Sequence, residues 1–88
     1  MYIILVYDII EPKRGTKLLK YLRQFLIWVQ NSVFEGEVTH AGLEIIKAGI
    51  KEIINKDKDS VIFYTFDSQN YTNRKVLGVE KSSTDTFI

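Results

Sequence analysis

Two nearly unbroken apolar runs constrain the fold of this chain more than any other feature of its sequence. Tyr2 to Tyr7 and Val61 to Phe66 are rich in β-branched and aromatic residues, which is typical of buried strands. A strand that borders water on one face alternates apolar with polar residues, and neither run alternates. We therefore expect both runs to be strands of a sheet that is covered on both faces.

Two segments with helical periodicity lie between these strands. The first is predicted to run from Gly15 to about Trp28, because it places an apolar residue at every third or fourth position, at Leu18, Leu22, Phe25 and Val29. The second is predicted to be capped by Thr39 and to bury a similar stripe, at Leu43, Ile46, Ile50 and Ile53. Each stripe predicts a helix that packs one face on the sheet.

The remaining segments complete an alternating order of strands and helices. Val29 to Val38 carries strand-forming residues interrupted by polar residues and a glycine, so it predicts two short strands or one broken strand. Ser60 to Phe66 predicts the next strand, and Lys75 to Val79 predicts a short one near the C-terminus. This order matches an antiparallel sheet with two helices on one face. The predicted fold class is α+β, a ferredoxin-like βαββαβ sandwich with a C-terminal strand or tail.

The size of the chain bears on what covers the second face of the sheet. With 88 residues it is predicted to be a single domain over 1–88, with a core over 1–79 and a tail over 80–88. A domain of this size buries only about 60% of the surface of its unfolded chain. A second copy of the same sheet would cover the open face, so we expect a homodimer. Phe87 and Ile88, beyond a polar spacer, are expected to cross to the partner subunit; the alternative is that they fold back on their own subunit.

Composition excludes several classes of site and points to another. The chain has no cysteine and one histidine, so it has neither a disulfide framework nor a Cys/His metal cluster, which fits a reducing cytoplasm. Its apolar runs fall far short of the ~20 residues of a membrane span, and we expect no membrane role. The net charge is +1, yet basic residues crowd the first predicted helix, at Lys13, Arg14, Lys17, Lys20 and Arg23. This stripe predicts a phosphate-binding surface, and a solvated helix face is the alternative.

Four segments, in the same order, resemble the family called CRISPR-associated protein two. The most specific is Trp28 to Glu37, which resembles the family's Val-Gln-x-Ser-Val-Phe-Glu-Gly core; the commoner family pattern places a glycine and an arginine where this chain has Leu26 and Trp28. The other three are Tyr7-Asp8-Ile9 with the basic helix start, Asp59 to Tyr64, and Val76-Leu77-Gly78 with the closing Phe87-Ile88. Together these segments span nearly the whole chain.

The resemblance implies a function in CRISPR antiviral defence. Members are ferredoxin-like homodimers that act beside the integrase, CRISPR-associated protein one, when foreign DNA is integrated into the repeat array. Mg²⁺-dependent cleavage of RNA or DNA is a property of some members, so the resemblance implies a metal-dependent endonuclease that binds DNA and RNA. The alternative is a purely structural adaptor of the integrase complex.

The resemblance also assigns site residues. It places Asp8 where two subunits meet, so that two carboxylates come together as Mg²⁺ ligands and catalytic groups; from the residues alone, the more common role for such an aspartate is to end a strand and favour the following turn. Ser32 and Phe34 lie in the most specific motif and are expected to serve structure or the dimer contact. Phe87 and Ile88 are expected at the dimer contact as well.

Overall fold

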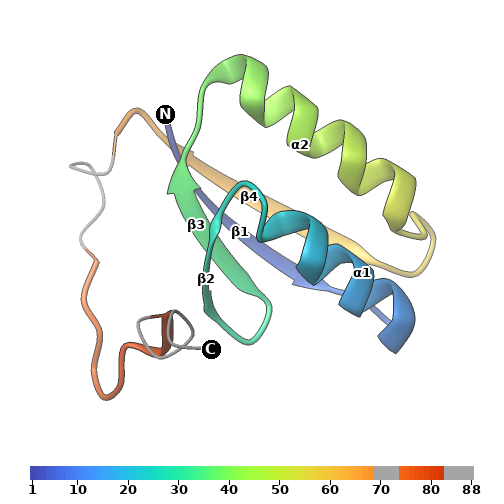
Figure 1. The fold of residues 1–88 in the computed structure, drawn as a ribbon, viewed down its shortest axis with the longest axis horizontal. Helices are drawn as coiled ribbons and strands as arrows, with labels where there is room; N and C mark the ends of the chain where they lie inside the picture. The colour runs from blue at the N-terminus through green and yellow to red at the C-terminus, as the bar shows by residue number, and fades with distance from the viewer. Residues whose placement is uncertain (69–73, 83–88) are drawn as a thin grey trace.

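The apolar runs form neighbouring strands of one antiparallel sheet. The computed structural model describes residues 1–68 and 74–82 of the chain. Its elements, in chain order, are β1 (Tyr2–Asp8), α1 (Pro12–Leu22), β2 (Ile27–Gln30), β3 (Val33–Glu37), α2 (His40–Ile53) and β4 (Ser60–Phe66). The strands lie in the order β2-β3-β1-β4, with every neighbouring pair antiparallel (Figure 1). The predicted α+β class, the βαββαβ order and the antiparallel sheet are confirmed.

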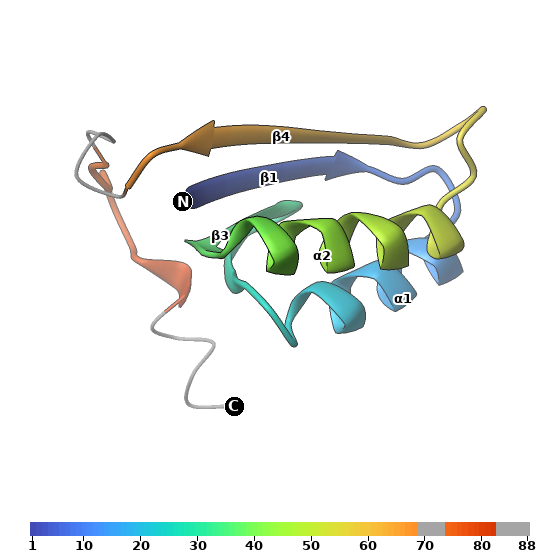
Figure 2. The ribbon, with the colours of Figure 1, turned by 90° about the horizontal axis from the view of Figure 1, so that it is seen from above.

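Both helices lie on the same side of this sheet (Figure 2). The central strand β1 pairs with β3 and β4, so that Leu5 lies opposite Phe34 on one side and Phe63 on the other. Because side chains alternate along a strand, Ile3 and Leu5 point toward the helices and are fully buried in the core. The core between sheet and helices therefore uses only half of the apolar side chains of β1.

The second helix has the predicted cap and stripe. The Thr39 hydroxyl oxygen accepts a hydrogen bond from the Gly42 backbone N–H at 2.9 Å, which satisfies one of the donors that a helix start leaves without a partner. Leu43, Ile46 and Ile50 are buried against the sheet. The predicted start and buried face of α2 are confirmed.

The predicted bounds of the first helix are wrong at both ends. The helix starts at Pro12 rather than Gly15, because a proline fits the first turn, where its missing N–H costs nothing. It ends at Leu22 rather than near Trp28, and the chain turns so that Leu26 reaches the core and β2 begins at Ile27. A Cβ atom on Gly36 would lie 3.0 Å from Leu26 Cδ2, so the missing side chain of β3 makes room for this turn.

The predicted strand at Lys75 to Val79 is also wrong. In the described residues 74–82 no strand is formed, and none of them pairs with an edge of the four-stranded sheet. Ion pairs hold this segment instead: Arg74 Nε lies 2.7 Å from a carboxylate oxygen of Glu35 on β3, and Arg74 Nη1 lies 2.9 Å from Glu80. Phe87 and Ile88 lie outside the described residues, so their expected contact with a partner stays a prediction.

The two helices approach each other closely at Tyr21 and Gly49. The Tyr21 hydroxyl donates a hydrogen bond to the backbone carbonyl oxygen of Ile45 at 3.0 Å, and its ring meets Phe25 edge-on with centroids 5.1 Å apart. A Cβ atom on Gly49 would overlap the Tyr21 hydroxyl and ring. The absence of a side chain at Gly49 therefore lets the tyrosine lie across α2.

We expect Gly49→Ala to have opposite effects in two backgrounds. Alanine improves the intrinsic helix propensity by about 1 kcal/mol. In the wild type its Cβ atom displaces the Tyr21 ring and its hydrogen bond, which together cost about 2 kcal/mol, so the net change is a loss of about 1 kcal/mol. In a Tyr21→Ala background the obstacle is gone, and the same change should stabilise the protein by about 1 kcal/mol. Urea denaturation of the four proteins measures this coupling, and additive effects would show that the close approach has no energetic weight.

Candidate metal and nucleic-acid site

The predicted catalytic residue, Asp8, is the last residue of the central strand. It is exposed and lies opposite Ser60, the first residue of β4. On the other side of β1, the Tyr7 backbone N–H donates to the Ser32 carbonyl oxygen at 3.0 Å. The backbone at the end of β1 is thus fixed between β4 and the β2–β3 turn, and it presents the Asp8 carboxylate at the surface.

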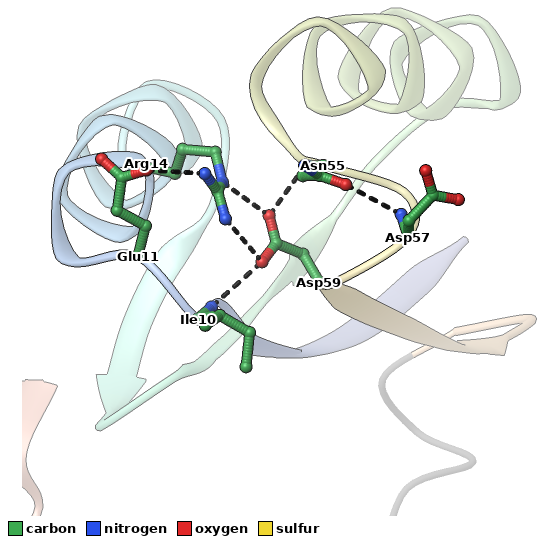
Figure 3. A network of polar contacts seen from close by, with 6 residues as sticks. All are labelled: Ile10, Glu11, Arg14, Asn55, Asp57 and Asp59. Carbon is green, nitrogen blue, oxygen red and sulfur yellow. Dashed lines mark hydrogen bonds and ion pairs between the residues drawn. The ribbon is translucent and has the colours of Figure 1, made fainter.

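A buried carboxylate, Asp59, fixes the loop that follows Asp8 (Figure 3). Its side chain is shielded from solvent and accepts hydrogen bonds from the Ile10 backbone N–H at 3.0 Å, the Asn55 backbone N–H at 2.8 Å and Arg14 Nε at 2.9 Å. The Arg14 guanidinium, followed by these backbone donors, holds the pKa of the Asp59 carboxyl well below its usual range. Asp59 therefore joins the start of α1 to the loop between α2 and β4, just beyond Asp8.

The five predicted phosphate contacts do not share one face. Lys13, Lys17 and Lys20 are exposed on α1. The Arg14 guanidinium instead faces Asp59 and also lies 2.7 Å from Glu11. Arg23, which caps the C-terminus of α1, is exposed and lies over the Trp28 ring, 6.0 Å from its centroid. The lysines form the basic surface of the helix, whereas Arg14 stabilises the fold.

Three neighbouring stripes run along α1. Successive residues of a helix are rotated by about 100°, so residues three or four apart share a face. The core stripe contains Leu18 and Leu22, the next stripe lines a cavity and contains Pro12, Thr16, Leu19 and Arg23, and the stripe beyond it contains the three exposed lysines. We call this third stripe, Lys13, Lys17 and Lys20, the lysine stripe.

The cavity lies between α1, the end of β1 and the β2–β3 turn. Its volume is about 440 Å³, and Tyr7, Asp8, Trp28 and Asn31 are among the residues that line it. Trp28 Nε1 donates a hydrogen bond to the Asn31 carbonyl oxygen at 3.0 Å, and Asn31 adopts a left-handed conformation with φ of 43°. The turn therefore holds the indole in place, and we call this hollow the Trp28 cavity.

The two predicted motif residues, Ser32 and Phe34, have structural positions. Phe34 is fully buried, and its ring is stacked with that of Tyr7 at a centroid distance of 6.3 Å. The Ser32 side chain is hydrogen-bonded to Tyr7. Burial raises the pKa of the Tyr7 phenol, and this hydrogen bond offsets part of that rise. Both residues thus support the strand end that carries Asp8.

The sheet face opposite the helices is apolar in its central part. Ile4 and Val6 of β1 are partly exposed there, and Ile62 and Tyr64 of the edge strand β4 are 47% and 52% exposed. Where β1 begins, at Tyr2, burial and the neighbouring Glu35 raise the pKa of the Tyr2 phenol to about 12. The expectation that this face needs a cover agrees with these exposures, and we call it the open face.

Asp8 offers one of the ligands that a Mg²⁺ site needs. A carboxylate oxygen is the kind of ligand that this ion prefers, and Asp8 offers one at an exposed position. Within residues 1–68 and 74–82, no group of three or more His, Cys, Asp or Glu side chains could enclose a metal ion. Asp8 therefore fits a site of the open kind, in which water and substrate phosphate supply most of the ligands.

Sequence reasoning missed two residues of this region. The sequence predicted no contact for Asp59, which only begins a segment that resembles the family, although an acid placed directly before an apolar strand is a signal for a cap or an ion pair. Trp28 was assigned to a helix end, and the unbroken trio Ile27 to Val29 was the signal for a strand.

Among the helices formed by the described residues, none is long and apolar enough to cross a membrane.

Comparisons with known proteins agree with this geometry. Residues 1–74 match the family described as CRISPR associated protein Cas2. The chain is 53% identical over 88 residues to the CRISPR-associated endoribonuclease Cas2 of Thermococcus kodakarensis, covering 100% of both chains. It is 51% identical over 88 residues to the protein of the same name from Methanocaldococcus jannaschii, covering 100% of this chain and 76% of that one.

Solved structures show the same fold. A crystal structure of a Cas2 protein superposes with a TM-score of 0.81 at 41% identity, covering 93% of this chain and 91% of that one. Streptococcus pyogenes Cas2 superposes with a TM-score of 0.78 at 32% identity, covering 89% and 100% of the two chains. The fold and sequence together define a small CRISPR-associated α+β protein. The chain belongs to the Cas2 family.

Proposed function

We propose that this protein is a homodimeric, Mg²⁺-dependent endonuclease of the CRISPR system that cleaves phosphodiester bonds in RNA or DNA. The observation that carries the proposal is the exposed Asp8 carboxylate at the fixed end of the central strand. Relatives about half identical to this chain are named endoribonucleases. A bound Mg²⁺ would neutralise charge that develops on the phosphate, and Asp8 would hold it.

The open face supports the homodimer. A second copy that covered Ile62 and Tyr64 would remove exposed apolar surface from water. The same association would bring the Asp8 carboxylates of the two subunits toward a common site, which supplies a second acidic ligand that one chain lacks. Residues 80–88 would add to the contact as a tail that crosses to the partner.

A second candidate function is that of an adaptor without chemistry. The lack of any group of three metal-ligating side chains in the described ranges favours it, because a single carboxylate per chain is a weak metal site. In this role the dimer and the lysine stripe hold incoming DNA beside the CRISPR integrase. Both roles place the protein in the capture of foreign DNA, and they differ in whether Asp8 performs chemistry.

A metal-removal experiment separates the two candidates. Wild-type protein, verified as a dimer by sedimentation, is incubated with single-stranded RNA and with double-stranded DNA in Mg²⁺, in EDTA, and in EDTA followed by excess Mg²⁺. We expect cleavage of at least one substrate that stops in EDTA and returns with the ion. Integration assays with the CRISPR integrase are run in parallel on the same protein samples. Normal integration without any cleavage would favour the adaptor and refute the endonuclease proposal.

A further inference from the structure

The Trp28 cavity is not explained by a phosphate-binding surface or by a metal site. Phosphate contacts require positive charge and metal sites require oxygen ligands, and Arg23 and Asp8 at the cavity wall could serve those needs. The cavity also presents an indole, a phenol ring and short polar side chains, from Trp28, Tyr7, Thr16 and Asn31, which neither kind of site requires. Its volume of about 440 Å³ falls within the usual range of small-molecule sites, about 300 to 1,000 Å³. An aromatic wall with a few polar groups at its rim suits a flat, polar-edged ligand.

We propose that the Trp28 cavity binds one unpaired nucleobase of a single-stranded nucleic acid, with the base stacked on the Trp28 ring. This inference rests on the proposed function, since it names the form of substrate that the Asp8 site takes. Every base has a flat face that stacks on an aromatic ring, so such a pocket is tolerant of sequence. A base within a duplex is already stacked between its neighbours and would have to be flipped out to enter.

The position of the indole supports this assignment. Its Nε1 is engaged by the Asn31 carbonyl oxygen at 3.0 Å, so the ring is held in one orientation before any ligand arrives. Arg23 lies over the ring, 6.0 Å from its centroid, and adds positive charge at that face. A ring that is already oriented loses little conformational entropy when a base stacks on it.

The surroundings of the cavity identify the ligand as a polymer rather than a free nucleobase. The lysine stripe adjoins the cavity wall on α1, so phosphates on one side of a bound base would meet Lys17 and Lys20. Asp8 lines the same cavity, so the phosphodiester next to the bound base would lie near the proposed metal ligand. The cavity would therefore favour cleavage of single strands over duplexes.

The chain provides its own reporter for this proposal, because Trp28 is its one tryptophan. Wild-type dimer in EDTA, which prevents cleavage, is titrated with a single-stranded oligodeoxynucleotide and with an abasic strand of the same length and charge. We expect the base-bearing strand to quench the Trp28 fluorescence and to bind about tenfold more tightly than the abasic strand. Quenching of equal size by the abasic strand would overturn the proposal, and this readout needs no variant.

Two variants separate the base from the phosphates. Trp28→Leu keeps an apolar side chain on β2 but removes the aromatic face. It should weaken binding of the base-bearing strand about tenfold and leave binding of the abasic strand unchanged. Lys17→Glu should weaken binding of both strands alike and make the negative slope of log K against log salt less steep by about 0.7. An equal loss for both strands in Trp28→Leu would show a structural role and refute the base pocket. If neither strand binds the wild-type protein, the proposed function itself fails.

Discussion

Asp8→Ala is expected to lower Mg²⁺-dependent cleavage by at least about a hundredfold while leaving the fold and the dimer intact. The carboxylate is exposed and stands at the end of β1, so its removal exposes no core and leaves no buried group without a partner. It is also the acid that we assign to the metal, and loss of an ion that stabilises developing charge costs several kcal/mol of barrier, where each 1.36 kcal/mol is tenfold in rate. Initial rates at saturating Mg²⁺, with sedimentation and thermal melting of the same samples, measure the separation.

Asp67→Ala provides the matched control for this experiment. Asp67 is also an exposed acid at a strand end, but it follows β4 at the opposite end of the sheet, because β4 runs antiparallel to β1. Its loss changes the net charge by the same amount and should leave cleavage unchanged. Cleavage that persists in purified Asp8→Ala protein would refute the catalytic assignment, and a dissociated or unfolded variant would make Asp8 a structural residue.

Asp59→Ala should cause the largest loss of stability, a fall in melting temperature on the order of 10 °C. The variant leaves the Arg14 guanidinium and the backbone N–H groups of Ile10 and Asn55 without their shared acceptor. Such unpaired donors cost more than the net value of the bonds themselves. Because the same acceptor fixes the loop beyond Asp8, cleavage should fall as well, even at temperatures where the variant is folded.

The effect of Asp59 should depend on pH in a defined direction. Its pKa in the folded protein lies well below its usual value, so the unfolded chain binds the proton more readily. Its contribution to stability is therefore complete above the unfolded pKa of about 4 and is lost as the pH falls below that value. Asp59→Asn lacks this titration, so the stability difference from wild type should shrink in acid.

Asp57→Ala is the control for Asp59. Asp57 belongs to the same loop, is exposed, and has its backbone N–H, not its carboxylate, in the hydrogen bond to Asn55 that Figure 3 shows. We expect a change in melting temperature of a few degrees at most. A similar loss of stability in both variants would mean that the loop tolerates no substitution, and that the network around Asp59 has no special weight.

The sequence predicted the four strands of the sheet better than it predicted the ends of the first helix. β4 has the bounds of the predicted strand, Ser60 to Phe66, because strand-forming residues and polar flanks coincide there. The first helix was predicted too long, because Phe25 and Val29 continue the helical spacing of Leu18 and Leu22 and no glycine or proline marks the end. Tertiary contacts decide this end, through the room that Gly36 leaves for Leu26.

The candidate site was predicted in part for a similar reason. Helical spacing pointed to the lysine stripe, and the resemblance to the family pointed to Asp8. The pairing of Arg14 with Asp59 could not be recognised locally, because these residues are 45 positions apart and meet only when α1 and the start of β4 are brought together by the sheet. An arginine next to lysines in the sequence was therefore predicted to bind phosphate, whereas in the fold its guanidinium faces Asp59.

The three stripes of α1 mean that the length of this helix is more constrained than its composition. A single inserted or deleted residue within Pro12–Leu22 would rotate everything beyond it by about 100°. That rotation would shift later residues of the core stripe, the cavity wall and the lysine stripe onto one another's faces. Point substitutions disturb one stripe at a time, whereas a change of register disturbs all three, so natural variation in this helix should consist of replacements at constant length.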